Sequence, residues 1–276
     1  MTDVLSPIIH QLSQAGIDSP RLEARMLIAE VLNCDIDELP IDISISKEQQ
    51  LLLYTLLKRR LSHEPLDKIL GYRDFYKYRF IVDHNVLSPR PDSEILVEEA
   101  IKLARANNFS SVLEFGVGSG CLIISILADI TEMHGLGLEK SASAIKIATQ
   151  NAKNIGVANR LALRLFDYFV DDVEGSFPLI ISNPPYISTN EISALDIEVK
   201  DYDPLIALDG GSDGYDHYRR LAQIVPNILQ SQGFLLLEGG QGQADTIASI
   251  FEQHGLHLVK KACDLSGIER CIILQK

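Results

Sequence analysis

The chain has 276 residues, of which 46% are hydrophobic and 23% charged, and these proportions exclude a disordered, collagen-like or coiled-coil chain. Its 25 Lys and Arg against 38 Asp and Glu leave a formal net charge of −13, so it lacks the basic excess that drives binding to phosphate backbones. No apolar run approaches the ~20 residues of a membrane span, the N-terminus lacks the cationic stretch of a signal peptide, and the four cysteines form no C-x-x-C pair. We expect a cytoplasmic protein of one or two domains, with reduced thiols and no membrane partner.

The first part of the chain predicts a small all-α domain. Apolar residues recur there with the helical period in three stretches. Ser19 and Pro20 are typical of an N-cap and a first helical turn, and Ser46 with Gln49 forms a capping box. We assign residues 1–70 to this domain.

The apolar pattern changes after this domain. Alternation with period two between Tyr72 and Val82 predicts a β-hairpin, and we assign residues 71–86 to it as a linker. In residues 87–276 apolar strands alternate with helical stretches, which indicates an α/β domain with a parallel sheet whose ligand lies beyond the carboxyl ends of the strands. The expected strands are residues 111–115, 134–139, 161–167, 177–182, 233–238, 256–263 and 270–274, and the expected helices are residues 122–127, 142–154 and 215–229.

The first strand of this domain leads into a glycine loop, Gly116-Val117-Gly118-Ser119-Gly120, and then into an apolar helix. Glycine is required where backbone approaches a ligand closely or takes a positive φ. The spacing is not the dinucleotide pattern G-x-G-x-x-G, because Cys121 stands at the sixth position, and no Gly-Lys-Ser/Thr of a Walker loop is present. The loop therefore predicts a ligand-binding turn without a phosphate clamp.

Acidic residues at successive strand ends indicate which ligand it is. Glu139 follows Gly120 by 19 residues and can accept hydrogen bonds from both ribose hydroxyls of a nucleoside. Glu114 can hold a cationic amine, and Asp167 and Tyr168 can flank an adenine. A ribose and an amine without a phosphate describe S-adenosylmethionine, and the scattered histidines predict no metal. The expected cofactor-binding residues are Glu114, Gly116, Val117, Gly118, Ser119, Gly120, Glu139, Asp167, Tyr168 and Asn183.

The fourth strand leads directly into Asn183-Pro184-Pro185-Tyr186. Consecutive prolines restrict the backbone, so the Asn183 side chain and the Pro184 carbonyl present two rigid acceptors to one site. Two fixed acceptors would orient the NH₂ group of a planar conjugated substrate, and Tyr186 would stack on that flat group. We predict methyl transfer to a planar nitrogen, with Asn183, Pro184, Pro185 and Tyr186 as the catalytic residues.

A run of acids follows this turn, at Asp196, Glu198, Asp201, Asp203, Asp209, Asp213 and Asp216. Its spacing matches no calcium loop, and such a run is by default a solvated loop. We also hypothesise that it steers a basic partner toward the site.

At these residues the chain resembles the release factor glutamine methyltransferases, the HemK or PrmC family of class I S-adenosylmethionine-dependent methyltransferases. The resemblance extends to residues 71–75, 87–94, 203–208 and 264–270, and to Leu237-Glu238 with Gly240 and Gln243. It implies a seven-stranded, mostly parallel Rossmann-like sheet with a reversed final strand. It also implies methylation of the side-chain amide of the glutamine in the Gly-Gly-Gln motif of class I peptide chain release factors.

Three other functions remain open at this point. A sister family methylates a glutamine of a large-subunit ribosomal protein and shares the same site. Adenine-amino DNA methyltransferases also use Asn-Pro-Pro-Tyr, but they contact phosphates and flip the base, and the charge of −13 predicts no direct nucleic acid partner. A binding module without catalysis is disfavoured because Asn183, Pro184 and the glycines are intact.

Overall fold

A computed structural model describes residues 4–276, and the chain divides into two compact units. The first contains the chain up to Gly71 together with Ile197–Tyr202, and the second contains Tyr72–Asp196 and Asp203–Lys276. The segment Ile197–Tyr202 follows the Asn-Pro-Pro-Tyr turn in the sequence but belongs to the N-terminal unit.

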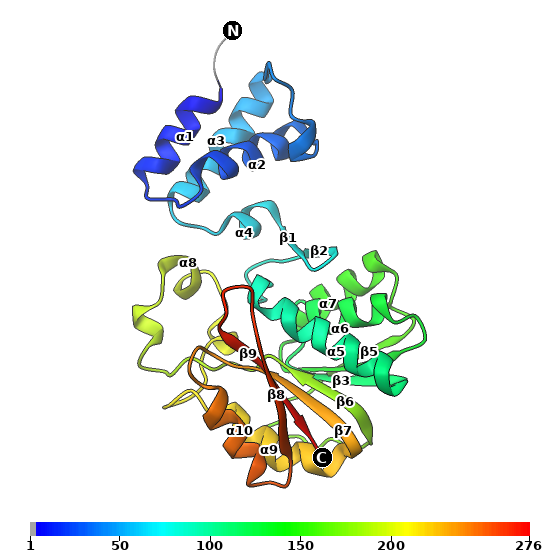
Figure 1. Ribbon diagram of the computed structural model, residues 1–276. Coiled ribbons are helices and arrows are strands. Elements are labelled where there is room, and N and C mark those ends of the chain that lie inside the picture. The colour runs from blue at the N-terminus through cyan, green and yellow to red at the C-terminus, as the bar shows by residue number, and fades with distance from the viewer. Residues whose placement is uncertain (1–3) are drawn as a thin grey trace. The chain divides into compact units, whose positions relative to one another are not determined.

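The N-terminal unit is helical, as its periodicity predicts (Figure 1). Its elements are α1 (Leu5–Gln14), α2 (Pro20–Leu32), the 3-10 helix η1 (Ile36–Glu38), α3 (Lys47–Leu61), α4 (Leu66–Leu70) and, from the distant segment, α8 (Ile197–Lys200). The capping box is confirmed, since Ser46 Oγ accepts from Gln49 N and Gln49 Oε1 accepts from Ser46 N. Pro20 begins α2, but Ser19 makes no side-chain capping bond.

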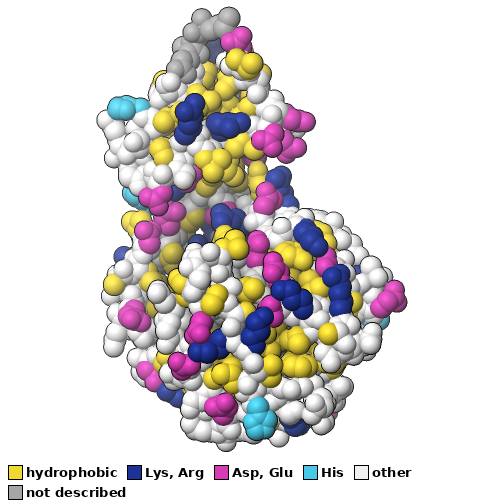
Figure 2. All heavy atoms as spheres, in the orientation of Figure 1, with side chains coloured by type: hydrophobic (Ala, Val, Ile, Leu, Met, Phe, Trp, Pro, Cys, Tyr) yellow, Lys and Arg dark blue, Asp and Glu magenta, His cyan; other side chains and the backbone are white. Residues whose placement is uncertain are grey.

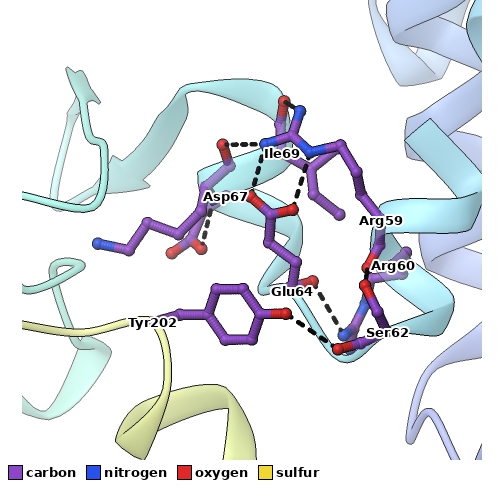
Figure 3. A network of polar contacts seen from close by, with 8 residues as sticks. Arg59, Arg60, Ser62, Glu64, Asp67, Ile69 and Tyr202 are labelled. Atoms are coloured by element: carbon purple, nitrogen blue, oxygen red, sulfur yellow. Dashed lines mark hydrogen bonds and ion pairs between the residues drawn. The ribbon is translucent and has the colours of Figure 1, made fainter. Parts of the chain in front are cut away.

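A polar network fastens the distant segment within this unit. The Arg60 side chain, which is 4% exposed, pairs with Glu23 Oε2 at 2.5 Å and with Glu198 Oε1 at 2.6 Å. The Tyr202 hydroxyl donates to the Ser62 carbonyl at 3.0 Å, as Figure 3 shows. A guanidinium that is buried between two carboxylates is held by charge-assisted bonds on both sides.

This network supports a stability prediction. Arg60→Ala leaves Glu23 and Glu198 without their shared cation, and we expect it to destabilise the helical unit by about 2–3 kcal/mol, somewhat less than for a fully buried pair because both carboxylates reach water. Lys58→Ala, which removes an exposed cation from the same helix, should cost less than about 0.5 kcal/mol. Urea denaturation followed by circular dichroism measures both, and equal losses would refute a structural role for the Arg60 pairs.

The second unit begins with an antiparallel hairpin of β1 (Tyr72–Phe75) and β2 (Tyr78–Ile81). The hairpin is confirmed, but the alternation predicted from Tyr72 to Val82 does not continue through Tyr76. That residue has a φ of 56° and lies in the turn together with Lys77.

The rest of this unit is a seven-stranded sheet in the order β5-β4-β3-β6-β7-β9-β8. The strands are β3 (Ser111–Phe115), β4 (His134–Glu139), β5 (Leu161–Leu165), β6 (Phe177–Ser182), β7 (Leu229–Glu238), β8 (His257–Cys263) and β9 (Glu269–Gln275). Neighbours from β5 to β7 are parallel, whereas β9 is antiparallel to both β7 and β8. The mostly parallel Rossmann-like sheet with its reversed final strand is confirmed.

Helices cover both faces of the sheet (Figure 1). One core packs α5 (Glu94–Asn107), α6 (Cys121–Asp129) and α7 (Ala142–Ile155) on one face. The other core packs α9 (Asp216–Ile228) and α10 (Ala244–Glu252) on the opposite face. Because both faces are covered, the middle of the central strand β6 is a continuous apolar run, and its Leu179, Ile180 and Ile181 are all fully buried.

Several predicted bounds were wrong. β5 ends at Leu165, so Asp167 and Tyr168 lie beyond the strand, and β7 begins at Leu229, four residues before Gly233. Helices α5 and α10 were not predicted. Short 3-10 helices η2 (Pro91–Ser93), η3 (Ile192–Ala194) and η4 (Leu205–Ala207) interrupt the loops.

The strand order determines where a ligand can bind. The chain runs from β3 to β4 and β5 on one side, then crosses to β6 and β7 on the other, so the order reverses between β3 and β6. In open α/β sheets the ligand crevice lies outside the carboxyl ends of the strands at such a reversal. The glycine loop follows β3 and the Asn-Pro-Pro-Tyr turn follows β6, so both predicted motifs lie at this point.

Candidate active site

The glycine loop occupies the turn between β3 and α6 with three positive φ values, 74° at Gly116, 56° at Gly118 and 84° at Gly120. A Cβ at Gly116 or Gly118 would project into open space, whereas one at Gly120 would lie 2.5 Å from Ile124 Cδ1. The first two glycines therefore form an open cradle, and the third permits close packing against α6.

Glu139, at the end of β4, braces this loop. Its Oε2 accepts from Gly118 N at 2.9 Å, and its Oε1 accepts from Ser141 N at 2.7 Å. Each carboxylate oxygen has a second lone pair, so both remain able to accept further bonds from a ligand.

Glu114 lies under the cradle in β3 and is 1% exposed. Its Oε2 accepts from Ile123 N at 3.2 Å, and burial raises its pKa well above the ordinary value, with the charge of Glu139 adding to the effect. A buried carboxyl of this kind ionises readily only beside a cation. An ammonium group in the cavity would supply that cation.

Aromatic side chains that follow β5 form another wall. Tyr168 stacks on Phe169 with ring centroids 5.3 Å apart, and its hydroxyl is hydrogen-bonded to His217 Nδ1. Asp167 Oδ2 pairs with Lys140 Nζ at 2.8 Å. A flat base would find aromatic surface and a carboxylate on this wall.

These walls enclose one cavity of about 620 Å³. Most predicted site residues line it: Glu114, Gly116, Val117, Gly118, Ser119, Glu139, Asp167, Tyr168, Asn183 and Pro185. Gly120, Pro184 and Tyr186 are not among the lining residues. The cavity accommodates a small organic ligand.

In the Asn-Pro-Pro-Tyr turn, Asn183 and Tyr186 point to different environments. Asn183 Nδ2 donates to Ser93 Oγ at 3.3 Å, and Asn183 lines the cavity. Tyr186 packs against the α9 and α10 core, its carbonyl accepts from Gln243 Nε2 at 3.0 Å, and burial raises its pKa to about 12. The structure therefore places the ring of Tyr186 in packing contacts, and its stacking on a substrate stays a prediction.

Sequence reasoning missed part of the lining. Residues 85–90 with Ser93, residues 204–207, Phe166 and His217 also line the cavity. The first two segments overlap stretches that carry the family resemblance, so that signal pointed to them without assigning a role. His217 had no such signal, since a lone histidine on a helix has no distinctive spacing.

An ion pair joins two of these segments. Arg90 Nη2 contacts Asp203 Oδ2 at 2.8 Å, with the Asp203 side chain 2% exposed. Other acids of the run after the turn are also paired, Asp213 and Asp216 with Arg219 and Glu198 with Arg60. Pairing reduces the field of the run at a distance, and this weakens the steering hypothesis. Figure 2 shows Lys and Arg side chains lying among Asp and Glu on one face of the second unit.

Fold and site together define an S-adenosylmethionine-dependent methyltransferase. Residues 78–198 match the methyltransferase small domain family, and residues 3–71 match the PrmC N-terminal domain family. A solved structure described as the "hMettl16 catalytic domain in complex with MAT2A 3'UTR hairpin 6" shares the fold, with a TM-score of 0.57 and 11% identity over 85% of this chain and 83% of that one.

The full-length relatives identify the family. The release factor glutamine methyltransferase of Rhodospirillum rubrum is 38% identical over 96% of this chain and 82% of its own length. That of Geobacter sulfurreducens is 38% identical over 95% of this chain and 91% of its own length. This chain belongs to the release factor glutamine methyltransferase family.

Two further observations concern metals and membranes. Among residues 4–276 no group of three or more His, Cys, Asp or Glu side chains is arranged to hold a metal ion. Within the same range no helix is both long enough and apolar enough to cross a bilayer.

Proposed function

We propose that this enzyme transfers a methyl group from S-adenosylmethionine to the side-chain amide nitrogen of the glutamine in the Gly-Gly-Gln motif of class I peptide chain release factors. One observation carries the proposal: Asn183 lines the cavity together with the glycine loop, and its Nδ2 donates to Ser93 Oγ. Its Oδ1 is then the polar atom left to accept from a substrate NH₂.

The cavity residues fit S-adenosylmethionine. Glu114 would hold the ammonium group, Glu139 the ribose hydroxyls, and Asp167 with Tyr168 the adenine, while the open faces of Gly116 and Gly118 leave room for close approach. When bound, the cofactor supplies an activated methyl group on a sulfonium.

The protein's own contribution is positioning. Two acceptors, Asn183 Oδ1 and the Pro184 carbonyl, orient both N–H bonds of the substrate amide and direct its nitrogen lone pair toward the methyl group. Pro184 is buried and Pro185 follows it, so this backbone has little freedom. No metal takes part in this scheme, and we propose that the enzyme acts in the cytoplasm on a protein partner without contacting nucleic acid.

Incubation with labelled S-adenosylmethionine tests the proposal. A class I release factor, the large-subunit ribosomal protein and DNA are offered in parallel, and mass spectrometry should place a single methyl group on the Gly-Gly-Gln glutamine. A release factor with Gln replaced by Ala in that motif is the matched control and should remain unlabelled. Label on the ribosomal protein alone, or on DNA alone, would overturn the proposed substrate.

A further inference from the structure

Glu238 is a buried carboxyl next to Asn183 that has no part in the scheme above. Ser182, the last residue of β6, pairs in register with Leu237 of β7. Asn183 is the first residue after β6, and Glu238 is the last residue of β7. Both therefore lie at the carboxyl ends of neighbouring parallel strands, at the same edge of the sheet.

Burial of the Glu238 carboxyl group costs free energy. The residue is 2% exposed, and no described group makes a well-formed hydrogen bond to its Oε2. A buried polar atom without a partner costs about 1–3 kcal/mol, and more when it is charged, so such atoms are rare in proteins and cluster at functional sites.

Charged and titratable groups face Glu238 from several elements: Arg270 of β9, Asp92 of η2, Tyr186, Tyr218 of α9, Cys121 of α6 and Cys271 of β9. Arg270 directs its Nε to Asp264 at 3.1 Å and its Nη2 to Asp92 at 3.2 Å, and it acts on Glu238 through its charge. Burial raises the pKa of Glu238 to about 7, against the lowering effects of the nearby Ser93 hydroxyl, Arg270 charge and Asn183 amide. Burial also raises the pKa of both tyrosines and both cysteines, so these groups stay uncharged near neutral pH.

The donors and acceptors near Glu238 favour one orientation of the Asn183 side-chain amide. Ser93 Oγ, which is buried, accepts from Asn183 Nδ2 at 3.3 Å, and its own proton is then available to the Glu238 carboxylate. An ionised carboxylate only accepts, so it favours the orientation in which the NH₂ of Asn183 faces Ser93 and Glu238. A protonated carboxyl can donate, which removes this preference.

We propose that Glu238 is a positioning residue that holds the Asn183 amide with Oδ1 toward the substrate. It does not line the cavity, and it acts through Asn183 and Ser93. This inference rests on the proposed function, since it assigns the group that orients the acceptor of that reaction. It requires the carboxylate form, so methyl transfer should increase with pH as Glu238 loses its proton.

The Glu238→Gln variant tests the proposal, because it keeps the shape but not the charge. In the wild type kcat should increase through a midpoint near pH 7. In the variant we expect kcat to fall roughly 10-fold or more, the size of a lost hydrogen bond to a charged group, with that pH dependence gone and the KM for S-adenosylmethionine unchanged. Glu99→Gln is the matched control, because Glu99 is also buried but pairs with Lys102 and Lys260 away from the cavity. His217, whose pKa is lowered by burial, is present in all three proteins and so cancels in the comparison.

A second readout does not depend on activity. The side-chain amide resonances of Asn183 in a ¹⁵N-labelled protein, assigned by their absence in Asn183→Ala, should shift with pH around 7 in the wild type and not in Glu238→Gln. A pH-independent amide in the wild type, or a Glu238→Gln enzyme with wild-type kcat and pH profile, overturns the inference. If the enzyme methylates no release factor but its Asn183 amide resonances still shift with pH as Glu238 ionises, the proposed function is refuted. The interaction between Glu238 and the Asn183 amide is then upheld.

Discussion

Replacement of Asn183 by Ala should lower kcat for release factor methylation by roughly 10²-fold or more, while the Kd for S-adenosylmethionine changes little. The reason is geometric. In the proposed mechanism Asn183 supplies one of two acceptors that fix the substrate NH₂, and loss of a preorganised polar contact of this kind typically has that effect. Initial-rate kinetics with a purified release factor measure kcat, and calorimetry measures cofactor affinity.

The control for Asn183→Ala is an exposed asparagine in the same unit. Asn107, at the end of α5, is exposed and donates to the Leu103 carbonyl of its own helix, so Asn107→Ala should keep the wild-type rate. Methylation at a near-normal rate by Asn183→Ala would show that the Asn-Pro-Pro-Tyr turn does not contribute to catalysis. A large loss of cofactor affinity in that variant would instead indicate that Asn183 serves mainly the cofactor.

Gly118→Val should weaken S-adenosylmethionine binding at least ~10-fold. At this position φ is 56° and a side chain would enter the open cradle between the glycine loop and the cavity. Two effects combine: the valine occupies space that the ligand needs, and a β-branched residue at positive φ strains the loop that Glu139 braces. Titration calorimetry with S-adenosylmethionine and with S-adenosylhomocysteine measures the loss.

Gly156→Val is the matched control for the backbone strain that Gly118→Val introduces. Gly156 ends α7 with a φ of 84°, and a Cβ there also meets nothing within 4 Å, but the position does not line the cavity. Gly156→Val should therefore lose stability by an amount similar to that in Gly118→Val, roughly 1–2 kcal/mol or more, without losing cofactor affinity. Equal affinities in the two variants would place the cofactor away from the glycine loop.

The sequence alone determined the features that depend only on residues close together along the chain. The capping box of α3, the positive φ values of the glycine loop and the rigid prolines after β6 follow from side-chain and backbone chemistry at consecutive positions. Alternation of apolar strands with helices was sufficient for the α/β class. Helices α5 and α10 were missed although both have an apolar face.

The tertiary structure decided which distant residues meet. Ser93 and Asn183 are 90 residues apart and Arg60 and Glu198 are 138 apart, yet each pair is in contact. The run of acids after the Asn-Pro-Pro-Tyr turn looked like a solvated loop, but the fold supplies Arg60, Arg90 and Arg219 as partners from other elements. Glu238 became a functional candidate only because β7 lies beside β6 with Leu237 opposite Ser182. Strand order and register depend on how whole elements pack, and local periodicity carries no information about which strand lies next to which.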